Sequence, residues 1–428
     1  MKSNKFYIIV FSILIVLLIA GGGLFIFYKK YFPLSKLKAN LSNEEVIDEN
    51  GNNIVDSDTD ISSKKTLNPQ PEIIKAIYAT SWSVSRESYI NYMINIARTT
   101  EINAVVIDIK DYSGYVAYNT ELPEVEKYGA EQIRISNVDS LIERLHQEGI
   151  YVIARISVFQ DPVLARARPD LAVHSKFKLS SLGLGFFSSA SLWLDNLELA
   201  WIDPAAKEAW DYNIAVSKDA ASRGFDELNF DYVRFPSDGN LNDMVFPLWD
   251  EATPKHLVIK DFFAQLRKEL PNVKLSIDLF GLTCSSYGDL GVGQVIEDAY
   301  EYFDYVCPMV YPSHYALGFL GYSNPAEHPY EVVRYSMESA LKKRAIYNES
   351  QEKSSSVPPS KTSEDEEEEK REVQLRPWIQ DFDLGADYNA GMVRAEIQAV
   401  YDALEDNFKG FMLWNSRNIY TTDALEPE

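Results

Sequence analysis

The chain contains the stretch Gly224-Phe225-Asp226-Glu227-Leu228-Asn229-Phe230-Asp231-Tyr232-Val233-Arg234-Phe235-Pro236, in which a short apolar β-strand ends in a carboxylate, an arginine and a proline. Charged groups at the end of a buried strand are costly unless they have partners or a function. In a barrel of parallel strands, the active site lies at the carboxyl ends of the strands. The stretch therefore predicts a catalytic strand, provided that the rest of the chain supplies a barrel.

Short apolar runs alternate with longer amphipathic segments from Lys75 onward. Several amphipathic segments end in glycine, as at Gly149 and Gly224, which is a common signal at the end of a helix. Strands that alternate with helices indicate parallel βαβ units, and eight such units match an α/β fold of the (β/α)8 TIM-barrel type. An open doubly wound sheet is the alternative, disfavoured because no glycine-rich phosphate loop follows the first strand. The predicted strands are Ala76–Trp82, Ala104–Ile109, Tyr151–Ile156, Glu227–Val233, Lys274–Phe280, Tyr305–Tyr311, Arg376–Phe382 and Gly410–Trp414, and the predicted helices include Ser88–Thr99, Val138–Gln147, Ala205–Arg223, Ile259–Leu270, Pro329–Ala345 and Gly391–Leu404.

Polar and aromatic residues recur near the carboxyl ends of the predicted strands. Side chains along a strand alternate between two faces, so residues of one parity share a face. The interior of a TIM barrel is normally filled by branched apolar side chains, so a polar set at one end predicts an active site at that mouth. The set comprises Asp108, Lys110, Arg155, Ser157, Asn229, Asp231, Arg234, Ser276, Asp278, Met309, Tyr311, Trp378, Gln380 and Trp414.

Asp231 and Asp278 lie on adjacent predicted strands, and such a pair suits glycoside hydrolysis, in which one carboxyl group protonates the leaving oxygen while the other attacks or activates water. We expect Arg234 to lower the pKa of Asp231 and keep it ionised. Asp278 has apolar neighbours, which favour a protonated acid. The residues expected to bind substrate are Asp108, Lys110, Arg155, Asn229, Arg234, Tyr311, Trp378, Gln380 and Trp414, with the tryptophans forming a floor under a sugar ring.

Each candidate also has a structural interpretation, as a satisfied ion pair, a hydrogen-bonded buried group or a core side chain. Asp381 has the opposite parity to Gln380 and is expected to face the helices or a loop. The structural interpretation applies to Asp108 with Lys110, to Arg155, to Asp231 with Arg234, to Asp278, and to Trp82, Trp378 and Trp414.

The chain resembles a bacterial family of glycosyl hydrolase domains from about Ile74 to about Asn418. The resemblance implies a TIM barrel related in architecture to α-amylases and chitinases. It is carried by these ordered blocks: Asp108-Ile109-Lys110-Asp111, Ala154-Arg155-Ile156, Trp201-Ile202-Asp203-Pro204, Phe230-Asp231-Tyr232-Val233-Arg234-Phe235-Pro236, Ser276-Ile277-Asp278-Leu279-Phe280-Gly281, Pro308-Met309-Val310-Tyr311-Pro312-Ser313-His314-Tyr315, Pro377-Trp378-Ile379-Gln380-Asp381-Phe382 and Gly410-Phe411-Met412-Leu413-Trp414.

The chain departs from both related architectures at the catalytic positions. Chitinases carry an Asp-x-Asp-x-Glu run on strand four, whose positions here resemble Asn229, Asp231 and Val233, so the acidic glutamate is missing. In α-amylases an arginine stands two residues before the nucleophile, where this chain has Asn229, and the acid on strand five is a glutamate rather than Asp278. Neither mechanism therefore transfers whole.

Other segments predict how the barrel is attached and what surrounds it. Residues 1–33 contain an apolar run from Tyr7 to Tyr28, which matches the length of about 20 residues that crosses a bilayer. We therefore expect a single membrane anchor in contact with the lipid bilayer. Both flanks are basic, which leaves the orientation open, and we favour a barrel on the extracytoplasmic side. Residues 34–71 read as a flexible acidic stalk, 72–428 as the barrel domain, and 348–372 as a disordered acidic insertion. The connection from Ser157 to Asp203 is expected to shape a substrate cleft.

Composition limits the function classes. The formal net charge of −23 makes a nucleic-acid partner unfavourable, whereas the 13% aromatic content suits a polysaccharide or oligosaccharide substrate. Cys284 and Cys307 are expected to be buried thiols, and with five scattered histidines they make no zinc motif, so neither a metal nor a cofactor is predicted. Two alternatives to a hydrolase are a non-catalytic carbohydrate-binding barrel and a metal-dependent deacetylase-like enzyme, for which His314 is the only histidine expected at the mouth.

Overall fold

The computed structural model describes residues 66–183, 186–355 and 372–427. The predicted anchor at residues 1–33, the stalk up to residue 65 and residues 356–371 of the predicted insertion lie outside these ranges. Within them, no helix is both long and apolar enough to cross a membrane.

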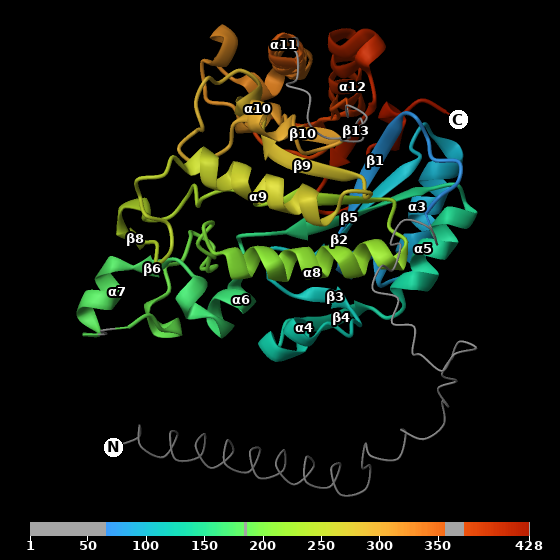
Figure 1. Cartoon of the computed structure of the whole chain (residues 1–428). Coiled ribbons are helices and arrows are strands. Elements are labelled where there is room, and N and C mark those ends of the chain that lie inside the picture. The colour runs from blue at the N-terminus through green and yellow to red at the C-terminus, as the bar shows by residue number, and fades with distance from the viewer. Residues whose placement is uncertain (1–65, 184–185, 356–371, 428) are drawn as a thin grey trace, which may run out of the picture. The chain divides into compact units, whose positions relative to one another are not determined.

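Eight parallel strands in the described part of the chain close into a barrel (Figure 1). The first strand pairs with the second on one side and with the last on the other, which completes the ring. The prediction of a (β/α)8 barrel is therefore confirmed, and each barrel strand overlaps its predicted range. The strands are β1 (Ile74–Ala79), β2 (Ala104–Lys110), β5 (Tyr151–Ser157), β7 (Glu227–Asp231), β9 (Leu275–Phe280), β10 (Tyr305–Met309), β12 (Trp378–Gln380) and β13 (Gly410–Trp414).

Short strands extend the barrel sheet or lie apart from it. β3 (Val116–Tyr118) pairs antiparallel with β2 and carries β4 (Glu131–Ile135) beside it. β11 (Gln374–Leu375) pairs with β10 just before β12. The connection after β5 contributes β6 (His174–Ser175), which pairs with β8 (Met244–Val245) in a separate two-stranded sheet.

Helices cover the outer face of the barrel (Figure 1). Every predicted helix is present, but α11 continues to Ser355, so residues 348–355 of the predicted insertion are helical. The connection between β9 and β10 holds only a one-turn α-helix, α10, which the sequence pattern did not predict. The longer helices are α3 (Glu87–Thr99), α5 (Val138–Gln147), α8 (Lys207–Arg223), α9 (Lys255–Glu269), α11 (Pro329–Ser355) and α12 (Ala390–Leu404), and the shorter ones are α2 (Ser81–Val84), α4 (Pro123–Tyr128), α6 (Pro162–Ala167), α7 (Lys176–Ser181) and α10 (Ile296–Ala299).

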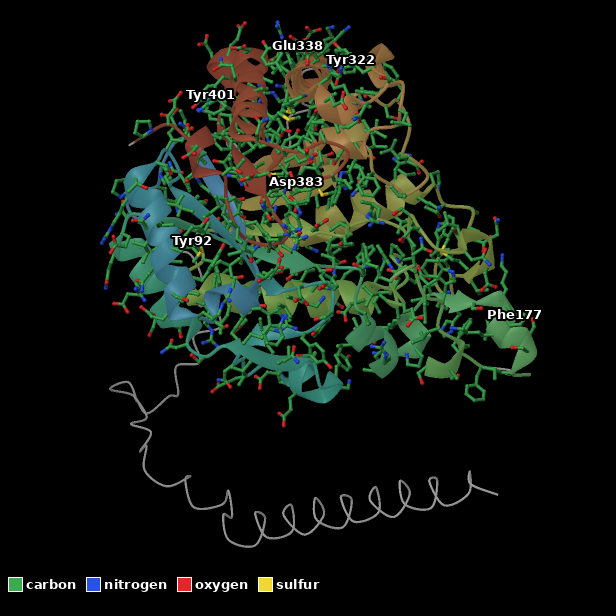
Figure 2. The ribbon with its side chains drawn as sticks, turned by 180° about the vertical axis from the view of Figure 1, so that it is seen from behind. Tyr92, Phe177, Tyr322, Glu338, Asp383 and Tyr401 are labelled. Atoms are coloured by element: carbon green, nitrogen blue, oxygen red, sulfur yellow. The ribbon has the colours of Figure 1, made fainter. Side chains whose placement is uncertain are left out.

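The side chains labelled in Figure 2 show where several helices lie around the barrel. α11 and α12 pack against each other, and Figure 2 shows Glu338 and Tyr401 on these two helices at the same end of the molecule. The excursion after β5 reaches one side of the barrel, and Figure 2 shows Phe177 of α7 on the side opposite Tyr92 of α3. The long connection after β5 therefore extends one side of the barrel.

Alternating strand residues divide the core into two layers. Outward side chains pack with the helices in one large apolar cluster. Inward side chains form a smaller cluster inside the barrel, which includes Tyr78, Tyr151 and Trp378. The two cysteines are free and buried, as predicted.

Candidate active site

Arg155 on β5 connects the carboxylates of three neighbouring strands. Its guanidinium pairs with Asp108 Oδ1 on β2 at 2.5 Å and with Asp231 Oδ2 on β7. The strand register explains the arrangement, because Arg155 lies directly opposite Asp108 on one side and Asn229 on the other. All three ionic groups are buried, so Arg155 compensates two carboxylates that would otherwise be costly.

Asp278 on β9 is the most deeply buried carboxyl group of the site, with 1% of its surface exposed. Its Oδ1 accepts hydrogen bonds from Asn229 Nδ2 at 2.9 Å and Trp378 Nε1 at 2.7 Å. Its Oδ2 has no hydrogen-bond partner in the described residues and lies 3.6 Å from Arg155 Nε. Burial, and then the charge of Asp231, raise the pKa of Asp278 to about 8. A proton on Oδ2 fits this environment, since Oδ1 already accepts two hydrogen bonds.

Arg234 does not pair with Asp231, so the expected pairing of these two residues is wrong. β7 ends at Asp231, and Tyr232 then takes a left-handed backbone with φ 54°. After this turn Arg234 Nη1 donates to Phe235 O at 3.2 Å and Ser237 Oγ at 3.0 Å. Its guanidinium also lies 4.8 Å from the ring of Trp201, in the excursion after β5. The cation beside Asp231 is Arg155.

Lys110 is also wrongly predicted, both as a mouth residue and as a partner of Asp108. The register shifts within β2, so that Asp108 lies opposite Arg155 and Lys110 lies opposite Ile156. This β-bulge inserts one residue and changes the face to which Lys110 points. The fully buried Lys110 Nζ pairs with Asp161 Oδ2 at 2.8 Å and donates to Ser157 O at 2.6 Å.

Three of the predicted binding residues lie beneath the cavity rather than on it. Gln380 is sealed, with Oε1 accepting from Ser313 and Nε2 donating to Phe382 O at 2.9 Å, so its expected contact with substrate hydroxyls is wrong. Asn229 donates a hydrogen bond to Asp278, and Asp108 accepts a hydrogen bond from the Tyr78 hydroxyl. Asp381 accepts from Thr421 in the neighbouring loop, as its parity predicted.

Two adjoining cavities open at the carboxyl ends of the strands. The deeper one, of about 190 Å³, contains both Asp231 and Asp278, and the outer one, of about 370 Å³, shares Asp231 and adds Arg234. Their apolar walls with a few charged groups are typical of small-molecule sites. The deep cavity is lined by Arg155, Asp231, Tyr232, Asp278, Met309, Tyr311, His314, Trp378 and Trp414, and the outer one by Asp231, Tyr232, Arg234, Phe280, Gly281, Leu282, Met309, Tyr311, His314 and Tyr315.

Sequence reasoning did not select Tyr232, Phe280 and Tyr315, which line the cavities, or Tyr78, which packs beside Arg155 and Trp414. The Tyr78 ring stacks on Trp414 with 4.1 Å between centroids, and Trp414 also lies 5.2 Å from the Arg155 guanidinium. The alternation of side chains along β1 could have identified Tyr78, because Tyr78 and Ala76 share the inward face of this strand. Trp82, considered as a core residue, is 57% exposed.

The fold and the cavity define a barrel of the glycoside-hydrolase type. A family model described as "Putative glycosyl hydrolase domain" matches residues 76–420, and the chain belongs to this family. The predicted family resemblance is therefore confirmed. No curated protein matches.

Solved structures resemble the chain to different extents. The glycoside hydrolase domain of PgaB (BpsB) from Bordetella bronchiseptica is 12% identical, with 81% of this chain and 95% of that chain covered and a TM-score of 0.52, which supports the fold. A hypothetical protein from Ruminiclostridium thermocellum is 39% identical over 47% of this chain and 96% of its own, with a TM-score of 0.41. An α-galactosidase from Thermus thermophilus is 12% identical over 80% of this chain and 58% of its own, with a TM-score of 0.43.

Proposed function

We propose that the chain is a glycoside hydrolase that cleaves O-glycosidic bonds of a polysaccharide with Asp231 and Asp278. One observation carries the proposal: the two carboxyl groups line one cavity in different electrostatic environments. Asp231 is paired with Arg155, whereas the pKa of Asp278 is raised to about 8. Glycoside hydrolysis requires this division between an ionised carboxylate and a protonated acid.

The proposed first step is proton transfer from Asp278 Oδ2 to the glycosidic oxygen. The bond between the anomeric carbon and that oxygen breaks, and Asp231 forms an ester with the anomeric carbon. Because Arg155 reaches both carboxyl groups with one side chain, the short separation of about 5 Å that accompanies retention is favoured over the longer inverting distance. Arg155 is a positioning residue in this scheme.

The second step follows from the electrostatic coupling of the two groups. The charge of Asp231 is one cause of the raised pKa of Asp278, so esterification of Asp231 removes that charge and lowers the pKa of Asp278. Asp278 is then suited to take a proton from water, whose oxygen attacks the anomeric carbon and releases Asp231. The proton given to the leaving group is thereby restored.

The proposal includes a location. The apolar run from Tyr7 to Tyr28 supports a membrane anchor within residues 1–33, with the barrel acting on an extracellular or cell-surface polysaccharide. Protease treatment of intact and permeabilised cells tests the orientation. Cleavage of the barrel only after permeabilisation would contradict it.

The catalytic proposal is tested by release of reducing ends from a panel of polysaccharides. Asp231→Asn and Asp278→Asn should each lower the rate at least about 100-fold, the low end for loss of an acid or base group. Asp261→Asn, at an exposed position on α9, is the matched control and should keep the full rate. Polysaccharide binding without turnover, unchanged by Asp231→Asn, would instead support the non-catalytic carbohydrate-binding barrel.

A further inference from the structure

Arg234 is a buried cation with unused hydrogen-bonding capacity at the edge of a cavity. Only 8% of its surface is exposed, yet it lines the outer cavity of about 370 Å³. Nη1 donates to Phe235 O and Ser237 Oγ, whereas Nε and Nη2 have no hydrogen-bond partner in the described residues. Neither of these two nitrogens is among the sealed polar atoms that lack a partner, so both keep accessible surface in a residue that lines the outer cavity.

Aromatic rings rather than carboxylates surround the Arg234 guanidinium. It lies 4.8 Å from the Trp201 ring, 4.8 Å from the Phe280 ring and 5.2 Å from the Tyr232 ring. No described carboxylate comes within ion-pair distance of it, and Asp231, Asp238 and Asp195 act only at longer range. Burial accordingly lowers the pKa of Arg234.

The other buried arginines of the barrel interior provide a comparison. Arg155 is paired with Asp108 and Asp231, and Arg376 is paired with Glu227. A buried charge without a counterion is costly, so a ligand that supplies an anionic group would stabilise the Arg234 guanidinium. Arg234 therefore differs from Arg155 and Arg376 in having no ion-pair partner among the described residues, although it lines a cavity.

We propose that Arg234 binds an anionic substituent on the sugar ring that occupies the outer cavity, next to the bond that is cleaved. This inference rests on the proposed hydrolase function. Nε and Nη2 form one edge of the guanidinium, which matches two oxygen atoms of a carboxylate or phosphate in a bidentate contact. Tyr311 and Tyr315 contribute aromatic walls to the same cavity, which suit the apolar faces of the sugar. The substrate class is therefore an acidic glycan, containing uronic acid or sugar phosphate.

Because the chain is acidic, an anionic ligand needs a cation close to it in the binding site. A net charge of −23 repels an acidic glycan at long range. At physiological ionic strength, charges beyond a Debye length of about 8 Å are largely screened, so contacts inside the cavity decide the binding. A short-range cation such as Arg234 can then select an anionic ring.

The test measures binding of matched oligosaccharide pairs to the full chain carrying Asp231→Asn, so that turnover does not interfere. The probes are glucuronate-containing and galacturonate-containing trisaccharides with their carboxyl-reduced counterparts, and a phosphorylated trisaccharide with its unphosphorylated counterpart. We expect at least one anionic probe to bind about tenfold to 100-fold more tightly than its neutral counterpart, the range for a hydrogen-bonded charged pair. The pair that shows the preference identifies carboxylate or phosphate as the substituent.

Variants of Arg234 assign the preference to this residue. Arg234→Gln should abolish it, and Arg234→Lys should keep part of it, because the charge remains while the bidentate geometry is lost. Arg334→Gln is the matched control, since Arg334 also lies against a tyrosine ring, Tyr330, but on the exposed surface of α11. A preference that survives in Arg234→Gln would overturn the proposal.

The outcomes separate this inference from the hydrolase proposal. Equal binding of every anionic and neutral pair, with polysaccharide turnover intact, overturns the Arg234 site alone. An Arg234-dependent preference without any turnover supports the site and rejects the hydrolase. If Arg234→Gln fails to fold, as judged by circular dichroism, the comparison of probe pairs in the Asp231→Asn chain and in its Arg234→Lys derivative still decides the question.

Discussion

At the scale of single residues, the site depends on one guanidinium group placed among three carboxyl groups. Arg155 pairs with Asp108 and Asp231, and its Nε approaches Asp278. The two paired carboxylates raise the pKa of Arg155 well above its usual value despite its burial. The third carboxyl group is left without a hydrogen-bonded cation, and its burial, followed by the charge of Asp231, raises the pKa of Asp278, which supports its proposed role as the acid.

The protonation of Asp278 predicts how stability depends on pH. Its pKa is about 8 in the folded chain against an ordinary value of 3.8, so between these pH values the folded state holds a proton that the unfolded state has lost. The stabilisation is therefore complete below pH 3.8 and is lost as the pH rises through about 8. In this window each pH unit lowers the free energy of unfolding by at most about 1.4 kcal/mol.

Urea denaturation at pH 5 and pH 8 measures this effect. Asp278→Asn should reduce the loss of stability between the two pH values, because the amide does not ionise. Burial also raises the pKa of Asp108 and Glu396, so part of the slope should remain in the variant. Identical pH slopes for the variant and the unsubstituted chain would show that Asp278 is not protonated in the folded state.

At the scale of strands and helices, the regular elements could be predicted from the sequence, whereas local irregularities could not. The alternation of apolar strands with amphipathic helices is a long-range pattern, and it located every barrel strand. Parity assigned Asp231 and Asp278 to one mouth, which the shared cavity bears out. It failed for Lys110 because a single inserted residue in β2 reverses the face, and no residue in Ala104–Lys110 signals such a bulge.

The early end of β7 had a similar consequence. The run Glu227–Val233 continues the strand pattern, but the left-handed Tyr232 ends the strand at Asp231 and redirects Arg234. Bulky residues rarely adopt positive φ, so the sequence favoured a longer strand. The sequence therefore does not predict the partners of Asp231 and Arg234.

Closure of the barrel between β1 and β13 predicts a requirement for glycine at one position. Gly410 begins β13 with φ 111°, and a Cβ there would overlap the carbonyl oxygen of Ile74 on β1. Gly149 has φ 72°, but nothing lies within 4 Å of the position that its Cβ would take. Gly149→Ala should therefore lower the free energy of unfolding by about 1–2 kcal/mol, the cost of a left-handed backbone in a residue with a Cβ. Gly410→Ala has the same cost and must in addition separate the first and last strands.

Chemical denaturation of the two variants distinguishes these contributions. Gly410→Ala should lose more free energy of unfolding than Gly149→Ala, and the difference reports the close approach of the two strands. Equal losses would mean that the β1–β13 contact adapts to a methyl group without cost.

At the scale of the whole molecule, the two ends of the barrel differ in which side chains they bring together. The carboxyl ends of the strands surround the two cavities that contain Asp231, and the amino ends hold the contacts described next. At the amino ends, Glu227 pairs with Arg376 inside the barrel. Leu67 N donates to Asp226 Oδ1 at 2.6 Å, and Asp226 Oδ2 accepts from Val152 N at 2.7 Å. Leu67 also packs against the inner apolar cluster.

These contacts predict where the barrel unit can be shortened. A chain that begins at Asp60 keeps the segment that carries Leu67, whereas a chain that begins at Glu72 lacks it. Loss of a hydrogen bond to a charged group and of part of a buried leucine should cost about 2 kcal/mol in the shorter chain. Both chains should keep the same kcat, because the segment lies at the opposite end from Asp231 and Asp278.

Urea denaturation of the two chains, with Leu67→Ala in the longer one as the matched variant, measures the loss of unfolding free energy. Coincident unfolding curves would show that the barrel is complete without residues 60–71 and that the Leu67 contact adds no stability.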